Sequence, residues 1–114
     1  MRRDDEVRLR HMLDAAKEAV TFVKGCTRGD LGNNRLLTLA LTKSIEIIGE
    51  AAAKIGPECR EEYPVIPWAA IVGMRNRLIQ GYFDIDVDRV WDTVVHDLPP
   101  LIAELEKILE PDAP

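Results

Sequence analysis

The chain has 114 residues, of which 46% are hydrophobic and 31% are charged, a composition typical of one globular domain with a single core. No apolar run reaches the roughly 18 residues that a membrane span needs, and no charged leader precedes an apolar stretch, so we expect a cytoplasmic protein. The net charge of −5 argues against a protein that coats nucleic acid with its whole surface, so any contact with RNA must be local.

The first predicted element is an amphipathic helix from Asp4 or Asp5 to Lys24. Apolar residues recur in it at helical spacing, and acidic residues in its first turn suit the helix dipole. Gly25 and the polar stretch after it end the helix. The expected core positions are Val7, Met12, Leu13, Ala16, Val20 and Val23.

A second helix is predicted from Leu31 or Asn34 to Ile55, with Asp30 or Asn33 as its cap and Gly56 and Pro57 after its end. The expected core stripe is Leu37, Leu41, Ile45, Ile48 and Ala52.

Small side chains gather near the end of this helix, at Gly49 and residues 51–53. They allow close approach of another helix, either from the same chain or from a partner. The connector that follows, residues 57–66, is predicted to contain one helical turn around Glu58 to Glu62.

Pro67 is predicted to begin a third helix that stops at Gly81. Polar and cationic residues crowd its last turns, after an apolar run at 68–72. They are Arg75, Asn76, Arg77 and Gln80. On a continuous helix Asn76 and Gln80 share a face, whereas Arg75 lies roughly 140° from Gln80. Either the long side chain of Arg75 or a second copy of the helix from another subunit would be needed to bring those last two together, and the second possibility favours a dimer.

Residues 82–88 alternate apolar and acidic side chains but find no partner strand in the sequence, so we expect an ordered loop. A fourth helix follows, capped by Asp86 or Asp88, and must kink or restart at Pro99 and Pro100. Its core positions are Val90, Trp91, Val94 and Val95, then Leu101, Leu105 and Ile108. The prediction is one all-α domain of residues 1–114 with four main helices, short helical pieces and frayed ends at 1–3 and 111–114.

The segment from Arg75 to Tyr82 resembles the motif of HEPN-domain ribonuclease toxins of the HepT type: Arg, four residues, His, one residue, Tyr. Asn76 and Gly81 also match, whereas Gln80 stands where that family has its histidine. The first amphipathic helix and residues 45–53, 67–68 and 90–101 are similar to that family as well. The resemblance covers nearly the whole chain and implies a HEPN-type helical bundle.

The resemblance implies metal-independent RNA cleavage without a cofactor, with Arg75, Asn76 and position 80 as the catalytic set and Arg77 as a substrate-binding residue. Arginine suits phosphate because its fork of donors matches phosphate oxygens and stays charged. Histidine can exchange a proton near working pH, but Gln80 cannot. We therefore hypothesise a ribonuclease scaffold with a disabled catalytic position, either a natural lapse or a deliberate substitution.

The same resemblance implies a homodimeric toxin that acts on RNA, without membrane or DNA contacts, and whose partner is a minimal nucleotidyltransferase antitoxin. In such families the antitoxin attaches AMP to the motif tyrosine, here Tyr82, which could instead be an aromatic anchor at the helix end. An alternative, favoured by Gln80 and the acidic balance, is a non-enzymatic helical binding module that is the partner and AMPylation substrate of the nucleotidyltransferase.

The remaining candidate residues point to no second site. Cys26 and Cys59 have no ligand spacing for zinc and no redox pattern, so free thiols are expected, with a disulfide between them as the alternative. His11 and His96 lie outside the motif and are expected at the surface or its boundary. The arginines near the start of the chain are expected to be solvated helix charges, with a local RNA patch as the alternative. They are Arg2, Arg3, Arg8 and Arg10.

Overall fold

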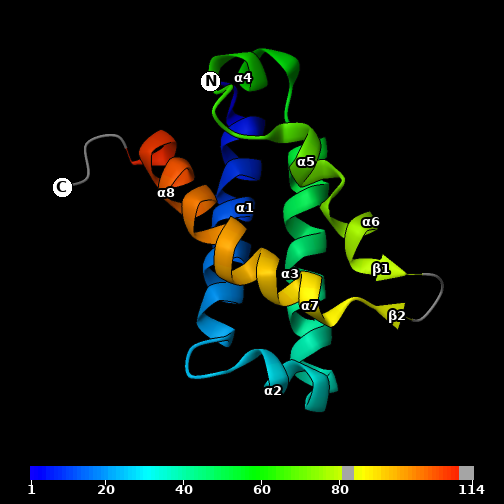
Figure 1. Cartoon of the computed structure of the whole chain (residues 1–114). Coiled ribbons are helices and arrows are strands. Elements are labelled where there is room, and N and C mark those ends of the chain that lie inside the picture. Colours follow the sequence, from blue (N-terminus) through cyan, green and yellow to red (C-terminus); the bar gives the residue numbers. More distant parts are fainter. Residues whose placement is uncertain (81–83, 111–114) are drawn as a thin grey trace.

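The computed structural model describes residues 1–80 and 84–110, without the side chain of Gln80. Figure 1 shows a helical bundle with one very short hairpin. The elements in chain order are α1 (Arg3–Phe22), α2 (Arg28–Asn33), α3 (Arg35–Ala53), α4 (Pro57–Glu62), α5 (Trp68–Val72), α6 (Met74–Leu78), β1 (Ile79–Gln80), β2 (Asp84–Ile85), α7 (Val87–Asp92), η1 (Thr93–Asp97) and α8 (Leu98–Leu109). The all-α prediction of four main helical stretches with short pieces is confirmed.

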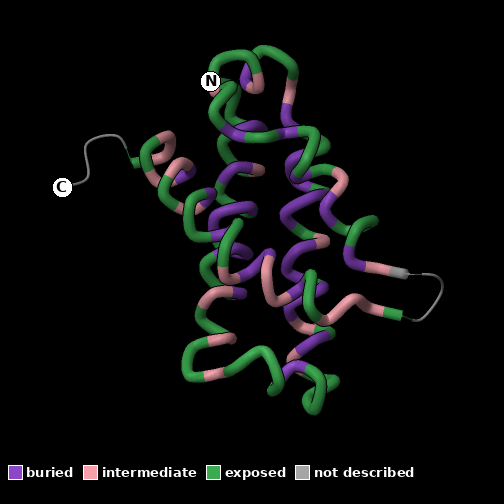
Figure 2. The backbone as a smooth tube through the Cα atoms, in the orientation of Figure 1, coloured by how far each residue is buried: buried purple, intermediate pink, exposed green. Residues whose placement is uncertain are grey.

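Two long antiparallel helices, α1 and α3, form the centre of the molecule (Figure 1). The continuous stretch α7–η1–α8 crosses them diagonally, and α5 and α6 lie along α3. Figure 2 shows that the buried positions face inward between these helices. The largest fully buried side chains include Leu9, Met12, Leu41, Ile45, Ile48, Leu98 and Leu105. The helical spacing of these apolar residues therefore builds one core shared by α1, α3 and α8.

The predicted ranges of the first two helices agree with α1 and α3 to within a few residues. One core position is wrong: Val7 is 45% exposed, because it lines an open hollow between α1 and α3. The predicted caps are also wrong. Asn34 caps α3 by accepting a hydrogen bond from the Leu37 amide, whereas Asp30 belongs to the capping box of the separate short helix α2.

The third helix is shorter than predicted. It divides at Gly73 into α5 and α6, and α6 ends at Leu78 instead of Gly81. The prediction failed because the Leu78 carbonyl, which could have continued a helix, accepts a hydrogen bond of 2.7 Å from the Asp86 amide. Asn76 and Gln80 therefore do not share a helical face, since Gln80 lies in β1.

The prediction of a loop without a partner strand at 82–88 is also wrong in part. Ile79 and Gln80 pair antiparallel with Ile85 and Asp84. The partner strand comes from the end of the predicted helix, which is why the local pattern did not reveal it. Asp86 then caps α7 by accepting from the Arg89 amide, as predicted.

The irregularity predicted at the double proline is present, one turn earlier than the prolines themselves. Residues 93–97 form the π-helical turn η1, and Pro99 and Pro100 lie in the first turn of α8. Proline lacks the amide that would bond back to the preceding turn, so the ladder loosens just before it.

Close packing within the chain explains the glycine of α3. A Cβ atom at Gly49 would lie 3.2 Å from the Ile71 carbonyl oxygen of α5. Cys26 and Cys59 are free thiols, as predicted, with Cys59 buried. Within the described residues, no helix is both long and apolar enough to cross a membrane. The predicted frayed tail at 111–114 lies outside the described residues.

Candidate functional site

The polar side chains of α6 lie on a five-residue helix that begins after Gly73 and runs directly into β1. Two buried residues, Met74 and Leu78, anchor this helix to the core one turn apart. Arg75, Asn76 and Arg77, the residues between those anchors, are all exposed. The spacing of the anchors therefore decides that these three side chains face solvent.

Arg75 leans toward α3. Its Nε atom lies 3.4 Å from Oε1 of Glu46, and the side chains are 48% and 26% exposed, respectively. This ion pair links the motif arginine to a residue 29 positions earlier in the chain (75 minus 46). Arg75 is thus held at one edge while about half of its surface stays open to a ligand.

Arg77 points to a different side of α6, as expected for two positions about 200° apart on a helix. Its Nη2 atom donates a hydrogen bond of 2.6 Å to the Ala70 carbonyl at the end of α5. Carbonyls in the last turn of a helix lack partners within it, so this bond completes the end of α5. The structure therefore does not bring Arg77 to the Glu46 side of the motif.

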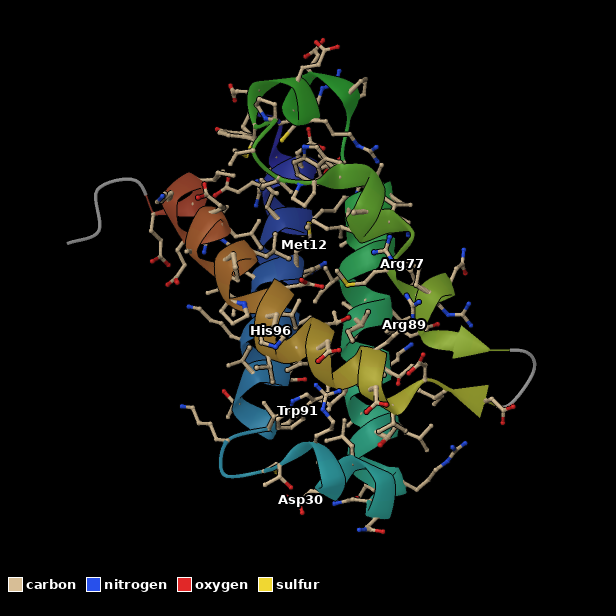
Figure 3. The ribbon with its side chains drawn as sticks, in the orientation of Figure 1. Met12, Asp30, Arg77, Arg89, Trp91 and His96 are labelled. Atoms are coloured by element: carbon tan, nitrogen blue, oxygen red, sulfur yellow. The ribbon has the colours of Figure 1, made fainter. Side chains whose placement is uncertain are left out.

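The Arg77 side chain borders a groove of about 490 Å³ between α5–α6 and η1–α8. The groove walls are mostly apolar, with Val65, Ile71 and Leu101 among them. His96 lies on the opposite wall, on η1, and Figure 3 shows that it is well separated from Arg77 along the groove. Arg77 also borders a smaller hollow with Arg89 and Asp97.

Position 80 is placed by its backbone alone, in β1 opposite Asp84. This strand pairing carries the chain away from α6 immediately after Leu78, so the direction of residue 80 is set by the hairpin and not by the helix. The predicted modification site, Tyr82, lies outside the described residues. Arg75 and Asn76 are therefore the predicted site residues that the structure places together, as neighbours on α6.

The sequence reasoning missed Glu46. Residues 45–53 contribute to the family resemblance and to the predicted core, yet no role was predicted for either of the two glutamates among them, Glu46 and Glu50. In the structure Glu46 is partly buried on α3 while the other charged residues of that helix are exposed, a difference that the sequence alone does not show. A partly buried carboxylate usually has a cationic partner.

The two histidines do not complete the motif. His11 on α1 and His96 on η1 are both exposed, as predicted, and neither lies beside Arg75 in any hollow of the described surface. The groups with shifted pKa values lie elsewhere too: burial raises the pKa of the Cys59 thiol on α4, and the hydrogen bonds that Arg28 donates to Asp92 and Asp88 raise the pKa of Arg28. Among residues 1–80 and 84–110, no cluster of His, Cys, Asp and Glu could hold a metal ion.

Comparison with known proteins gives a consistent answer. The family model described as "Ribonuclease HepT-like" matches residues 12–108. The "Putative RNase MJ1216" of Methanocaldococcus jannaschii is 35% identical over 109 residues, covering 96% of this chain and 90% of the relative. The "Probable ribonuclease HepT" of Thermococcus cleftensis is 34% identical over 100 residues, covering 84% and 91%. No solved structure matches.

Proposed function

Because the chain belongs to the HepT-like ribonuclease family, we propose that it is the toxin subunit of a toxin–antitoxin system. In this proposal it has the scaffold of a metal-independent RNA endonuclease, and its catalysis is impaired by Gln80. The observation that carries the proposal is the half-exposed Arg75, which is ion-paired with Glu46 of α3. Arg75 lies on α6, a helix that buried residues anchor to the core at both of its ends. A guanidinium in that position can take a phosphate of RNA through its remaining donors. Its charge also suits the transition state, in which negative charge grows on the phosphate oxygens.

Asn76 adds a neutral donor and acceptor beside Arg75, which suits a ribose or phosphate oxygen of the same nucleotide. Gln80 can hydrogen-bond but has no proton to exchange, so proton transfer at the attacking 2′-hydroxyl lacks its usual agent. Positioned acid–base catalysis contributes on the order of 10²–10⁴ in rate, so its loss weakens cleavage without removing the RNA contact. The predicted substrate role of Arg77 stays a prediction, and we centre the RNA contact on Arg75.

We propose a homodimer that brings the two motifs to one cleft. The outer face of α3, next to the Arg75–Glu46 pair, carries an exposed apolar row. Leu36 is 79% exposed, Leu39 44% and Ile47 37%. These three positions follow the spacing of one helical face, on which the exposed cation Lys43 lies between Leu39 and Ile47. Such a face suits a second copy of the same helix.

A second candidate function is a binding module without enzymatic activity, which Gln80 favours. In that form the chain would serve a cytoplasmic minimal nucleotidyltransferase as its partner and as the acceptor of AMP at Tyr82. The two functions differ in one measurable respect, because only the first predicts that a histidine at position 80 creates a nuclease.

The test compares the unsubstituted chain, which carries Gln80, with its Gln80→His variant on a small structured RNA in the presence of a chelator, following cleavage products on a gel. We expect the histidine form to cleave at least about 100-fold faster, since a proton-transfer group is restored. A third protein, Gln80→His combined with Arg75→Ala, controls for contaminating nuclease and should cleave as slowly as the unsubstituted chain.

If neither the unsubstituted chain nor Gln80→His cleaves the RNA, the nuclease proposal is wrong and the binding module takes its place. The same proteins can then be incubated with a minimal nucleotidyltransferase and ATP and examined by intact mass. A gain of AMP that Tyr82→Phe abolishes would support the module.

A further inference from the structure

Arg75 has one side-chain partner among the described residues, the carboxylate of Glu46. The contact runs to Nε, with a separation of 3.4 Å from Oε1. An arginine side chain carries five N–H donors, one on Nε and four on the two terminal nitrogens. The Glu46 carboxylate lies nearest to Nε as an ion pair, and the two terminal nitrogens have no hydrogen-bond partner among the described residues.

The surroundings limit where this ion pair can form. Glu46 is 26% exposed and lies on the long helix α3, so the backbone that carries its carboxylate is rigid. Arg75 comes from a five-residue helix whose neighbours Met74 and Leu78 are buried. A flexible side chain is thus tied near its end to a rigid element, which restricts the directions that the outer nitrogens can face.

We infer that Glu46 is a positioning residue for Arg75, whose ion pair at Nε holds the guanidinium so that its two terminal nitrogens meet a phosphate end-on. The inference rests on the proposed function, since it gives Arg75 a phosphate ligand. Two parallel hydrogen bonds to phosphate need a defined plane for the guanidinium, and preorganising that plane lowers the entropy lost on binding.

The opposite role, a carboxylate that competes with RNA for Arg75, makes the contrary prediction. Removal of a negative charge from a protein of net charge −5 raises its affinity for RNA in general. A competitor would add to that gain, whereas a positioning residue would reverse it. The sign of the change therefore distinguishes the two roles, provided that the general effect of charge is measured separately.

Glu50 supplies the matched control. It lies one turn further along α3, is exposed, and has no ion pair or side-chain hydrogen bond in the described part of the chain. Glu50→Gln therefore makes the same change of charge on the same helix as Glu46→Gln, without touching Arg75. Thermal unfolding of all variants checks that each is folded before any comparison.

The experiment measures binding of a fluorescein-labelled RNA stem-loop by fluorescence anisotropy. The proteins compared are the unsubstituted chain, Arg75→Ala, Glu46→Gln, Glu46→Ala and Glu50→Gln. We expect Glu46→Ala to bind roughly twofold to fivefold more weakly than Glu50→Gln, the ratio that corresponds to an exposed ion pair. In the Gln80→His background, Glu46→Ala should lower kcat more than it raises KM, because misorientation matters most in the transition state.

A readout without RNA separates this inference from the proposed function. The NMR resonance of the Arg75 Nε–H group is assigned by its loss in Arg75→Ala. Its chemical shift should differ from that of free arginine in the unsubstituted chain and in Glu50→Gln, and should equal that of free arginine in Glu46→Ala. Release of that resonance together with RNA binding equal to or tighter than that of Glu50→Gln overturns the positioning role. If Arg75→Ala leaves RNA binding unchanged, the proposed RNA contact fails, and the positioning role fails with it.

Discussion

At the scale of single residues, neighbours in the sequence have separate roles in space. Arg75 pairs with Glu46 on α3, whereas Arg77, two positions later, completes the end of α5 at Ala70. Arginines at such spacing look equivalent in the sequence but face different sides of a helix. The role of each is therefore decided by what the facing element presents to it, a carboxylate in one case and an unpaired carbonyl in the other.

Gly49 shows the same dependence on a facing element. We expect Gly49→Ala to destabilise the fold by about 1 kcal/mol, because overpacking against a carbonyl costs about 1–3 kcal/mol and helix propensity returns about 1. The added Cβ would lie 3.2 Å from the Ile71 oxygen and 3.6 Å from the Val72 oxygen. Urea unfolding measures the change.

Gly32→Ala is the control for that substitution. Gly32 lies in α2, and a Cβ atom added there would have no atom within 4 Å, so only the propensity gain of about 0.5–1 kcal/mol remains. If both alanine variants are stabilised equally, close approach of α3 and α5 is not what requires glycine at position 49.

At the scale of elements, the ends are decided by specific hydrogen bonds. α3 begins where the Asn34 side chain accepts from the Leu37 amide at 3.0 Å, and α6 ends where the Leu78 carbonyl turns to Asp86. The first of these bonds is local and could have been read from the sequence, which instead offered Asp30 and Asn33 as competing caps. The second joins two segments across a hairpin, so no local pattern contains it.

The cap of α3 gives a prediction at this scale. Asn34→Ala should lower the free energy of unfolding by about 1 kcal/mol, because the amide of Leu37 loses its acceptor at the start of a central helix. The adjacent Asn33→Ala should change it by less than about 0.5 kcal/mol, since Asn33 is exposed at the end of α2 and its side chain donates only a long hydrogen bond of 3.4 Å to the Gly29 carbonyl. Equal effects in chemical denaturation would contradict the assignment of Asn34 as the cap.

At the scale of the whole molecule, the arrangement of α3 decides what a second copy can meet. One side of α3 packs on α1 and another on α5 and α6, and the remaining side carries the apolar row of Leu36, Leu39 and Ile47. The Arg75–Glu46 pair lies at the border of that row. Association through this face would bring the two copies of the motif near each other.

We expect Leu39→Glu to convert the proposed dimer into a monomer, because it places a charge within an apolar contact. Val65→Glu is the control: Val65 is 62% exposed, but it lies in the segment before α5, on the wall of the groove beside α8. Light scattering after size-exclusion chromatography gives the mass of each variant. If the unsubstituted chain is already monomeric at high micromolar concentration, the proposal of a dimer is wrong.

The sequence by itself determined the helical bundle, most of the buried faces of α1 and α3, a cap at Asp86 or Asp88, and the placement of Arg75 and Asn76 side by side. These features follow from periodicity and local capping, which depend on residues within a turn or two of each other. Only the tertiary structure decided that α6 stops at Leu78, that β1 pairs with β2, and that Glu46 holds Arg75. Each of these depends on contacts between segments that are separated along the chain, and such contacts exist only after the helices have packed.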